Sequence, residues 1–303
     1  MRIAAIAAGT NSCRLLIVRR DDSGLHVEHH DIRATRLGEG LVAGAALQPD
    51  AMRRTLATIV EFAQLAKRAD ALSIIGTHAL RAASDSAEFV RRVHEMTGTE
   101  LRVLTAEEEA HASFAGAMWA LEHVGKVPAS VTVVDIGGGS TELALRKDSS
   151  GAVHVVSLSV GAVSLKERFF KHDPPLATEL TACRTAVRFE LERSDAATIP
   201  EGALVAVGGT ADTAARMLNA YDPAGEVRVG VVRVDDLTDL LRLTSALTLD
   251  ARKRLHGLPE SRADIFPAGL IVLEEIARHA RLSEMQVTES DLLLGFVLQE
   301  IET

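Results

Sequence analysis

The amino-acid sequence predicts an α/β protein made of two domains with the same pattern of elements. Strands alternate with helices along the chain, which is typical of the α/β class. An apolar strand, a glycine turn and a second apolar strand follow one another near the start of each half. The length of 303 residues suits about two domains. The repeat is therefore one of structural pattern rather than of sequence letters.

Composition narrows the classes of function. The chain is 47% hydrophobic and 25% charged, as in an ordinary globular protein, but only 3% aromatic. Few rings are available to stack on bases, and the formal net charge of -9 leaves no basic surplus, so we expect no nucleic-acid partner. No uninterrupted apolar run of about 18 residues occurs, so we expect no membrane partner. Two distant cysteines and a short apolar start, with no signal segment, predict a cytoplasmic protein without disulfides.

Each half has its own order of elements, which apolar spacing and turn residues indicate. Gly125 and Pro128 mark the expected boundary, giving domains 1–124 and 125–289, with a final helix at about 290–303. In the first half we expect strands at 3–6, 15–18, 25–30 and 72–75, and helices at 52–66, 88–96 and 106–121. In the second half we expect strands at 131–134, 142–145, 153–157, 204–207 and 285–287, and helices at 164–170, 179–193, 237–243, 267–280 and 291–301, with one more starting at 208–210.

The glycine turn of the second half predicts a phosphate and metal site. Glycine after a strand lets backbone N–H groups approach an anion closely, because no Cβ intervenes. Hydroxyls and carboxylates flank the glycines, and Mg²⁺ prefers oxygen ligands and commonly bridges to phosphates. An ordinary tight hairpin is the alternative. The predicted phosphate ligands are Gly137, Gly138, Gly139 and Ser140, and the predicted metal ligands are Asp135 and Glu142.

Two further turns are weaker signals of the same kind. The first-half turn combines one glycine with polar side chains, and a plain hairpin is its alternative; its residues are Gly9, Thr10, Asn11, Ser12, Cys13 and Arg14. Cys13 is more readily explained as a packing residue than as a nucleophile, because no histidine adjoins it in sequence. The third turn lies between a strand and a helix, where free amides bind anions; its residues are Gly208, Gly209 and Thr210.

These motifs, in this order, resemble the exopolyphosphatase / guanosine pentaphosphate phosphohydrolase (Ppx/GppA) family in its short form. The resemblance extends over essentially the whole chain, and the Asp-Ile-Gly-Gly-Gly-Ser-Thr-Glu string is its most specific part. The matching segments are Gly9 to Leu15, Thr77 to Ala83, Glu107-Glu108-Glu109-Ala110, Asp135 to Glu142, Gly208-Gly209-Thr210 and Gly257 to Ile265.

The family resemblance implies a fold and a reaction. The fold would be two actin-like domains (ribonuclease H-like, of the sugar kinase/actin superfamily) with the active site in the cleft between them and the last helix packed on the first domain. The reaction would be hydrolysis of the terminal phosphoanhydride of inorganic polyphosphate, or of pppGpp to ppGpp. Glu109 would orient or activate the water, Arg81 would clamp a phosphate, and Mg²⁺ or another divalent cation would be the cofactor. Arg262 is a weaker phosphate ligand, and a homodimer is one candidate assembly.

The chain departs from the family pattern at three places. Ala7 stands where relatives have an Asp that helps to hold the metal or its waters. His111 replaces an Arg, and Leu292-Leu293-Leu294-Gly295 replaces a common Leu-Arg-Glu-Gly. The change at Ala7 leaves open a second interpretation, a catalytically weak sensor of polyphosphate or nucleotide.

The residues by themselves also permit a different activity and simpler roles for the charged side chains. An ATP-dependent sugar kinase would share the fold, because fold alone does not set function. The three glutamates could only favour a helix start through the helix dipole. Arg81 could be a solvated helix residue.

Overall fold

The computed structural model describes residues 1–148, 151–195, 199, 202–222 and 227–302. Contacts divide the chain into two compact units. The first contains Met1–Glu109 and the C-terminal segment from Phe296, and the second contains Ala110–Gly295. The division lies in the first turn of a continuous helix, α4 (Ala106–His123), and the segment 124–130 lies inside the second unit. The expected boundary relied on Gly125 and Pro128, whereas the division falls between Glu109 and Ala110, where no glycine or proline occurs.

The sheet of the first unit has the strand order β3-β2-β1-β4-β5. β1 (Arg2–Ala8) pairs antiparallel with β2 (Cys13–Asp21), which pairs antiparallel with β3 (Gly24–Arg33). On its other side β1 pairs parallel with β4 (Ala71–Gly76), which pairs parallel with β5 (Leu101–Val103). The turn 9–12 therefore lies beside the carboxyl end of β4, where Thr77 follows.

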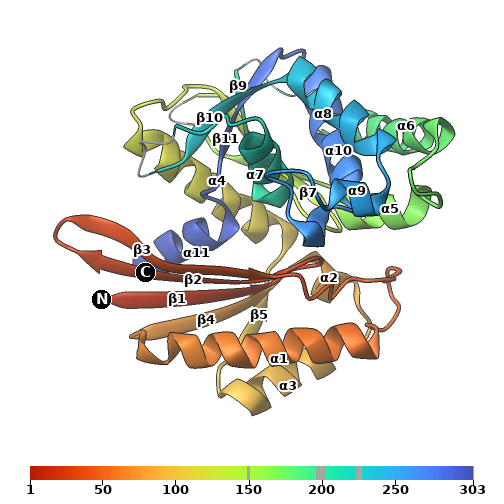
Figure 1. Cartoon of the computed structure of the whole chain (residues 1–303). Coiled ribbons are helices and arrows are strands. Elements are labelled where there is room, and N and C mark those ends of the chain that lie inside the picture. The colour runs from red at the N-terminus through yellow and green to blue at the C-terminus, as the bar shows by residue number, and fades with distance from the viewer. Residues whose placement is uncertain (149–150, 196–198, 200–201, 223–226, 303) are drawn as a thin grey trace. The chain divides into compact units, whose positions relative to one another are not determined.

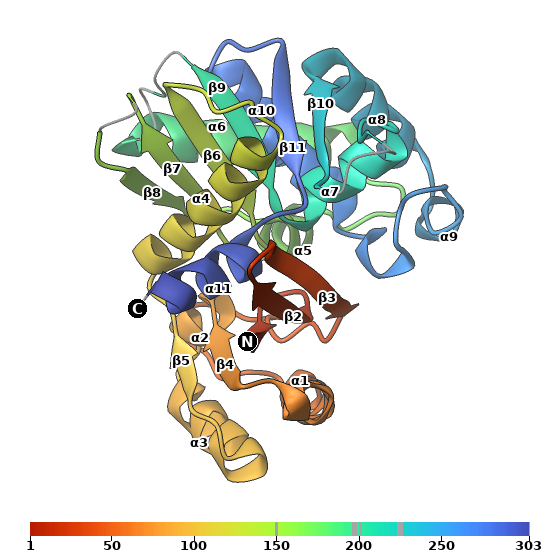
Figure 2. The ribbon, with the colours of Figure 1, turned by 90° about the vertical axis from the view of Figure 1, so that its left-hand side faces the viewer.

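Helices cover both faces of this sheet. α1 (Pro49–Leu65), which is followed by the short helix η1 (Ala66–Arg68), and α3 (Ser86–Thr97) lie on one face, over a core that includes Ile6, Leu15 and Phe62 (Figure 1). α11 (Leu292–Glu302) lies over the opposite face with its residues from Phe296 onward (Figures 1 and 2). The short helix α2 (His78–Ala82) follows β4 directly and carries Arg81.

The sheet of the second unit repeats the same topology and adds one strand. Its order is β10-β11-β9-β6-β7-β8. β6 (Val131–Ile136), β7 (Thr141–Arg146) and β8 (His154–Leu158) form an antiparallel meander, and β9 (Ala203–Val207) and β11 (Glu284–Thr288) continue parallel to β6. β10 (Val229–Arg233) adds an antiparallel edge. Two units with one strand order confirm the predicted α/β, actin-like fold.

Side chains of β6 alternate between two layers, because successive residues of a strand point to opposite faces. Val131 and Val133 pack with α4, whereas Val134 and Ile136 pack into the larger core on the other face. The helices over that core include α5 (Ala162–Phe169), α6 (Ala177–Arg193), α7 (Gly208–Met217), α8 (Val234–Ala246) and α10 (Phe266–His279) (Figure 2). Asp135 follows the same alternation and faces α4.

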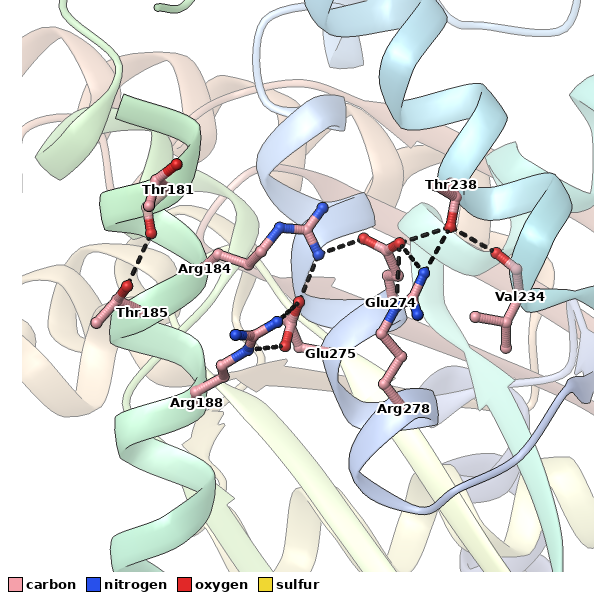
Figure 3. A network of polar contacts seen from close by, with 9 residues as sticks. All are labelled: Thr181, Arg184, Thr185, Arg188, Val234, Thr238, Glu274, Glu275 and Arg278. Atoms are coloured by element: carbon pink, nitrogen blue, oxygen red, sulfur yellow. Dashed lines mark hydrogen bonds and ion pairs between the residues drawn. The ribbon is translucent and has the colours of Figure 1, made fainter. Parts of the chain in front are cut away.

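An ionic network joins three of these helices (Figure 3). Glu274 and Glu275 of α10 are buried, and Arg184 of α6 contacts both carboxylates. Arg188 Nε donates to Glu275 Oε2 at 2.5 Å. Thr238 of α8 donates to Glu274 Oε1 at 2.6 Å. The network therefore holds α6 and α8 against α10.

The predicted long elements are present, with ends that differ by a few residues. The structure adds four short elements to the prediction: α2, β5, β10 and α9 (Leu249–Arg252), together with the single turns η1 and η3 (Glu260–Arg262). Elements of three to five residues are too short to show a clear hydrophobic period. Over the part of the chain that is described, no helix combines the length and apolar character that crossing a membrane requires.

Candidate active site

The first glycine turn of each unit closes with the same hydrogen bond. Gly9 N donates to Ser12 O at 3.0 Å, and Gly137 N donates to Ser140 O at 3.0 Å. In each unit the turn joins the first two strands of the sheet, β1 to β2 and β6 to β7. The repeat seen in the strand order thus extends to individual backbone atoms.

The glycine turn of the second unit is held from one side by α5. Ala162 N and Val163 N donate to the carbonyl oxygens of Gly137 and Gly138 at 3.0 and 2.8 Å. A Cβ on Gly161 would lie 2.6 Å from Gly138 C and O, so only glycine permits this approach. Because the C=O and N–H of one trans peptide point in opposite directions, the amides of Gly138 and Gly139 point away from α5. Two neighbouring amides so directed form an anion-binding concavity.

The turn of the first unit is held in the same way by the segment 36–38. Arg36 N donates to Asn11 O, and Gly38 N donates to Thr10 O, both at 2.9 Å. By the same peptide geometry, the amides of Asn11 and Ser12 point away from that segment. The Asn11 side chain is buried, and its Oδ1 has no hydrogen-bond partner among the described residues. A buried carbonyl oxygen in this state is a place where a water or a ligand donor would bind.

Two carboxylates face each other across the second-unit turn. Asp135 and Glu142 are a cross-strand pair, so their side chains lie on one face of the sheet. Ser113 of α4 donates to Asp135 Oδ2 at 2.5 Å, and Ser140 and Ser157 donate to Glu142 Oε1 at 2.7 and 3.1 Å. Like charges directly opposite are unfavourable in a sheet, and a cation between them removes that cost.

This donor set fits the expected Mg²⁺. Magnesium is commonly bound through one or two carboxylates together with waters and substrate phosphates, not by a cage of protein ligands alone. Asp135 and Glu142 supply such a pair. No group of three or more His, Cys, Asp or Glu side chains suited to a metal ion is found within the described ranges.

The third glycine turn begins α7 next to Asp135. β9 pairs with β6 so that Val207 lies opposite Asp135, and Gly208 follows with a φ of +80°. A Cβ on Gly208 would lie 2.5 Å from Asp135 Oδ1, so both the backbone angle and the carboxylate require glycine. The Arg262 guanidinium lies directly over Gly209, where a Cβ would come within 1.8 Å of its Nη2. A guanidinium at the positive end of a helix suits an anionic ligand.

Glu109 is a buried carboxylate at the start of α4, with 6% of its surface exposed. Arg81 Nη1 donates to Glu109 Oε2 at 2.6 Å and to Leu104 O at 2.9 Å, so Arg81 and Glu109 form a fixed pair. Burial raises the pKa of Glu109, and the positive charges of Arg81 and Arg14 only partly offset this rise. A carboxylate with a raised pKa is suited to accept a proton near neutral pH.

The three consecutive glutamates have different surroundings. Glu107 is exposed. Glu108 forms a capping box with Thr105: Thr105 N donates to Glu108 Oε2 at 2.7 Å, and Glu108 N donates to Thr105 Oγ1 at 3.1 Å. The bond from the Thr105 amide, together with Arg102, lowers the pKa of Glu108. A role in starting the helix thus accounts for Glu108, whereas Glu109 is turned inward to Arg81.

Two of the predicted phosphate ligands have side chains that point elsewhere. The Cys13 thiol packs into the apolar core of the first unit, and its burial raises the pKa to about 12. Thr210 is buried against Gly269 of α10. Packing therefore explains both side chains.

The structure adds two serines that the sequence did not indicate, Ser113 and Ser157, through their bonds to Asp135 and Glu142. Ser113 lies one helical turn after Glu109 in α4, and this spacing of four residues is the one signal that could have indicated it. Ser157 pairs across strands with Glu142, which no sequence pattern shows.

Comparison with known proteins agrees with these features. Residues 16–302 match the model of the Ppx/GppA phosphatase family. The chain is similar to exopolyphosphatase 2 of Mycobacterium tuberculosis, at 34% identity over 98% of each sequence. It is also similar to the guanosine-5'-triphosphate,3'-diphosphate pyrophosphatase of Vibrio cholerae, at 31% identity over 99% of this chain and 59% of that protein. The Ppx/GppA family member of Aquifex aeolicus, a solved structure, superposes with a TM-score of 0.81 at 27% identity, over 100% of this chain and 98% of that one.

Proposed function

The chain belongs to the Ppx/GppA phosphatase family, and from that premise we propose that it hydrolyses the terminal phosphoanhydride of inorganic polyphosphate or of pppGpp. Curated relatives include proteins named for each of the two activities. The observation that carries the proposal is the buried pair of Glu109 and Arg81. It combines a carboxylate of raised pKa with a guanidinium that holds it in place.

Each group then has a role in the reaction. Glu109 orients the attacking water and takes its proton as the water oxygen bonds to the terminal phosphorus. The amides of the turns bind phosphate oxygens, so that negative charge leaving with the shortened chain is stabilised. Arg81 holds Glu109 and contributes positive charge toward the phosphate. Asp135 and Glu142 would hold Mg²⁺, which when bound neutralises phosphate charge.

The test is phosphate release from polyphosphate and from pppGpp with Mg²⁺ present. We expect release from at least one of them, and the ratio of the two rates identifies the preferred substrate. Failure to release phosphate from both substrates, by the natural protein and by the Ala7→Asp variant, would contradict a hydrolase.

A catalytically weak sensor is the second candidate, and one structural comparison favours it. The second unit has Asp135 opposite Glu142, but the first unit has Ala7 opposite Arg14 at the equivalent cross-strand position. The first unit therefore lacks the carboxylate that would hold metal or its waters. Ala7 itself is buried, with 1% of its surface exposed.

Replacing Ala7 distinguishes the two candidates. A charged hydrogen bond is worth about 1.5–3 kcal/mol, so Ala7→Asp is expected to raise kcat by roughly tenfold or more if the missing carboxylate limits turnover. Ala7→Asn, of the same size without the charge, is the matched control and should not raise it. Both variants overpack a buried position and should lower Tm. Normal turnover by the natural protein, with no gain in Ala7→Asp, would rule out the sensor.

Two further features of the proposed enzyme are its cellular setting and its assembly. Cys13 and Cys183 are buried thiols without a disulfide, which fits the expected cytoplasmic setting. A homodimer stays a candidate assembly, which size-exclusion chromatography with light scattering would test.

A further inference from the structure

Ser113 is a buried serine on the face of α4 that packs against the sheet of the second unit. Ala110 and Ala117, three residues before it and four after it, pack with Val133 of β6. Asp135 lies two residues further along the same face of that strand, and Ser113 Oγ donates to its Oδ2 at 2.5 Å. An O–H···O distance of this length is typical of a bond to a charged carboxylate. Ser113 therefore holds the Asp135 carboxylate from the side of α4.

The Ser113 hydroxyl differs from other helix hydroxyls of this chain in where its proton goes. The hydroxyls of Thr55, Thr97 and Thr244 each donate to the carbonyl oxygen four residues earlier in their own helix. That local bond is open to any serine or threonine inside a helix. A hydroxyl has one proton to donate, and Ser113 donates it to Asp135 on another element. The tertiary contact is thus made in place of the local one.

The Asp135 carboxylate is held from a second side by the third glycine turn. A Cβ on Gly208 would lie 2.5 Å from Asp135 Oδ1, so the backbone of Gly208 lies directly beside that oxygen. The last side-chain torsion of an aspartate is broad when nothing restrains it. Here a rotation of the carboxylate would break the bond from Ser113 to Oδ2. The contacts with Ser113 and Gly208 together therefore fix the plane of this carboxylate.

Glu142, the cross-strand partner of Asp135, is also held by serine hydroxyls. Ser140 and Ser157 both donate to Glu142 Oε1. Serines thus bond to one oxygen of each carboxylate in the pair that fits Mg²⁺. Partners of this kind orient metal ligands, and their loss typically weakens metal binding or activity about 10–100-fold. Ala7 stands at the equivalent position of the first unit, so the orientation of this one pair matters more for holding a cation.

We propose that Ser113 is a positioning residue for the metal, whose hydroxyl fixes the Asp135 carboxylate in the orientation that binds Mg²⁺ or another divalent cation. The proposal rests on the proposed function, in which that cation neutralises substrate phosphate. Ser113 acts only through Asp135 and touches neither the cation nor the substrate. Its loss should therefore weaken metal binding while the proton-accepting step at Glu109 is kept.

The experiment measures the dissociation constant of Mn²⁺ alone, from the electron paramagnetic resonance signal of the free ion. Ser113→Ala should bind Mn²⁺ about 10–100-fold more weakly than the natural protein. Thr244→Val is the matched control, because it removes another buried hydroxyl whose bonds lie within α8, and it should leave Mn²⁺ binding unchanged. Asp135→Asn should abolish the binding, which shows that the ion is held by this carboxylate.

Ser113→Thr keeps a hydroxyl at this position and should bind Mn²⁺ more tightly than Ser113→Ala. This second variant separates the loss of the hydroxyl from a general disturbance of α4. The proposal is overturned by equal Mn²⁺ affinities in the natural protein and Ser113→Ala, or by equal losses in Ser113→Ala and Thr244→Val. It is also overturned by no recovery in Ser113→Thr, or by a natural protein that binds no Mn²⁺ at Asp135.

Phosphate release separates this proposal from the proposed function. In Ser113→Ala the Mg²⁺ concentration for half-maximal rate should rise by a similar factor, whereas kcat at saturating Mg²⁺ should be retained. If the protein releases no phosphate but Ser113→Ala still weakens Mn²⁺ binding, the positioning role stands and the hydrolase proposal fails. Normal hydrolysis with equal Mn²⁺ affinities would leave the hydrolase intact and remove the role of Ser113.

Discussion

Replacing Glu109 with Gln keeps the shape of a buried side chain and removes its charge. Arg81 can still donate to the amide oxygen and remains bonded to Leu104 O, so the pair should stay in place. The variant loses only the ability to accept a proton from water. General-base catalysis typically contributes about 10²–10⁴-fold, so we expect a loss of that size in kcat, equivalent to about 3–5 kcal/mol in the barrier.

The same substitution has an opposite effect on stability. Burial raises the pKa of Glu109 in the folded protein, so the folded state holds the proton more tightly than the unfolded chain does. Ionisation therefore costs folding free energy, and the cost appears as pH rises through the raised pKa. Gln cannot ionise. Relative to the natural protein, the variant should therefore gain stability as the pH rises from an acidic to a mildly alkaline value. The activity of the natural protein, which needs ionised Glu109, should rise with pH in the same direction.

Three measurements check this reasoning together: steady-state phosphate release, polyphosphate affinity, and Tm at one acidic and one mildly alkaline pH. Glu107→Gln is the matched control, because Glu107 is exposed two residues earlier in the same helix turn and should keep full activity. Turnover within about threefold of the natural protein would show that Glu109 is not the base. A fall in affinity together with a fall in Tm at both pH values would show a structural glutamate instead.

Two more substitutions test the packing that positions the site. Gly161→Ala puts a Cβ 2.6 Å from Gly138 backbone atoms, so the glycine turn must shift. We expect chemical unfolding to show an overpacking cost of about 1–3 kcal/mol, and steady-state kinetics to show a raised KM. An unchanged KM would mean that the turn does not bind substrate. Glu275→Ala removes a buried carboxylate whose two arginine partners are partly exposed and can turn to water. We expect the free energy of unfolding to fall by about 2 kcal/mol while kcat is retained. A change near zero would show that the network in Figure 3 adds no stability.

Local patterns in the sequence were sufficient to predict the helices, strands and glycine turns that depend mainly on residues close together in the chain. The apolar run of β6 and the helical pattern of α1 and α10 predicted those elements within a few residues, because buried positions require apolar side chains. The string Asp135 to Glu142 predicted a glycine turn between two strands, which the hydrogen bond from Gly137 N to Ser140 O closes. The sequence also indicated the repeat of two units, which the matching strand orders confirm.

Tertiary structure decided what depends on partners distant in the chain. Adjacent glutamates look alike in sequence, yet Glu108 caps α4 and Glu109 turns to Arg81, 28 residues away, because helix rotation sends successive side chains to different surroundings. The support of the glycine turn by α5, the contact of Arg262 with Gly209 and the bond from Ser113 to Asp135 likewise arise only when separate elements pack. The chemical types at this site could be read from the sequence, but their burial, and hence the pKa of Glu109, required the fold.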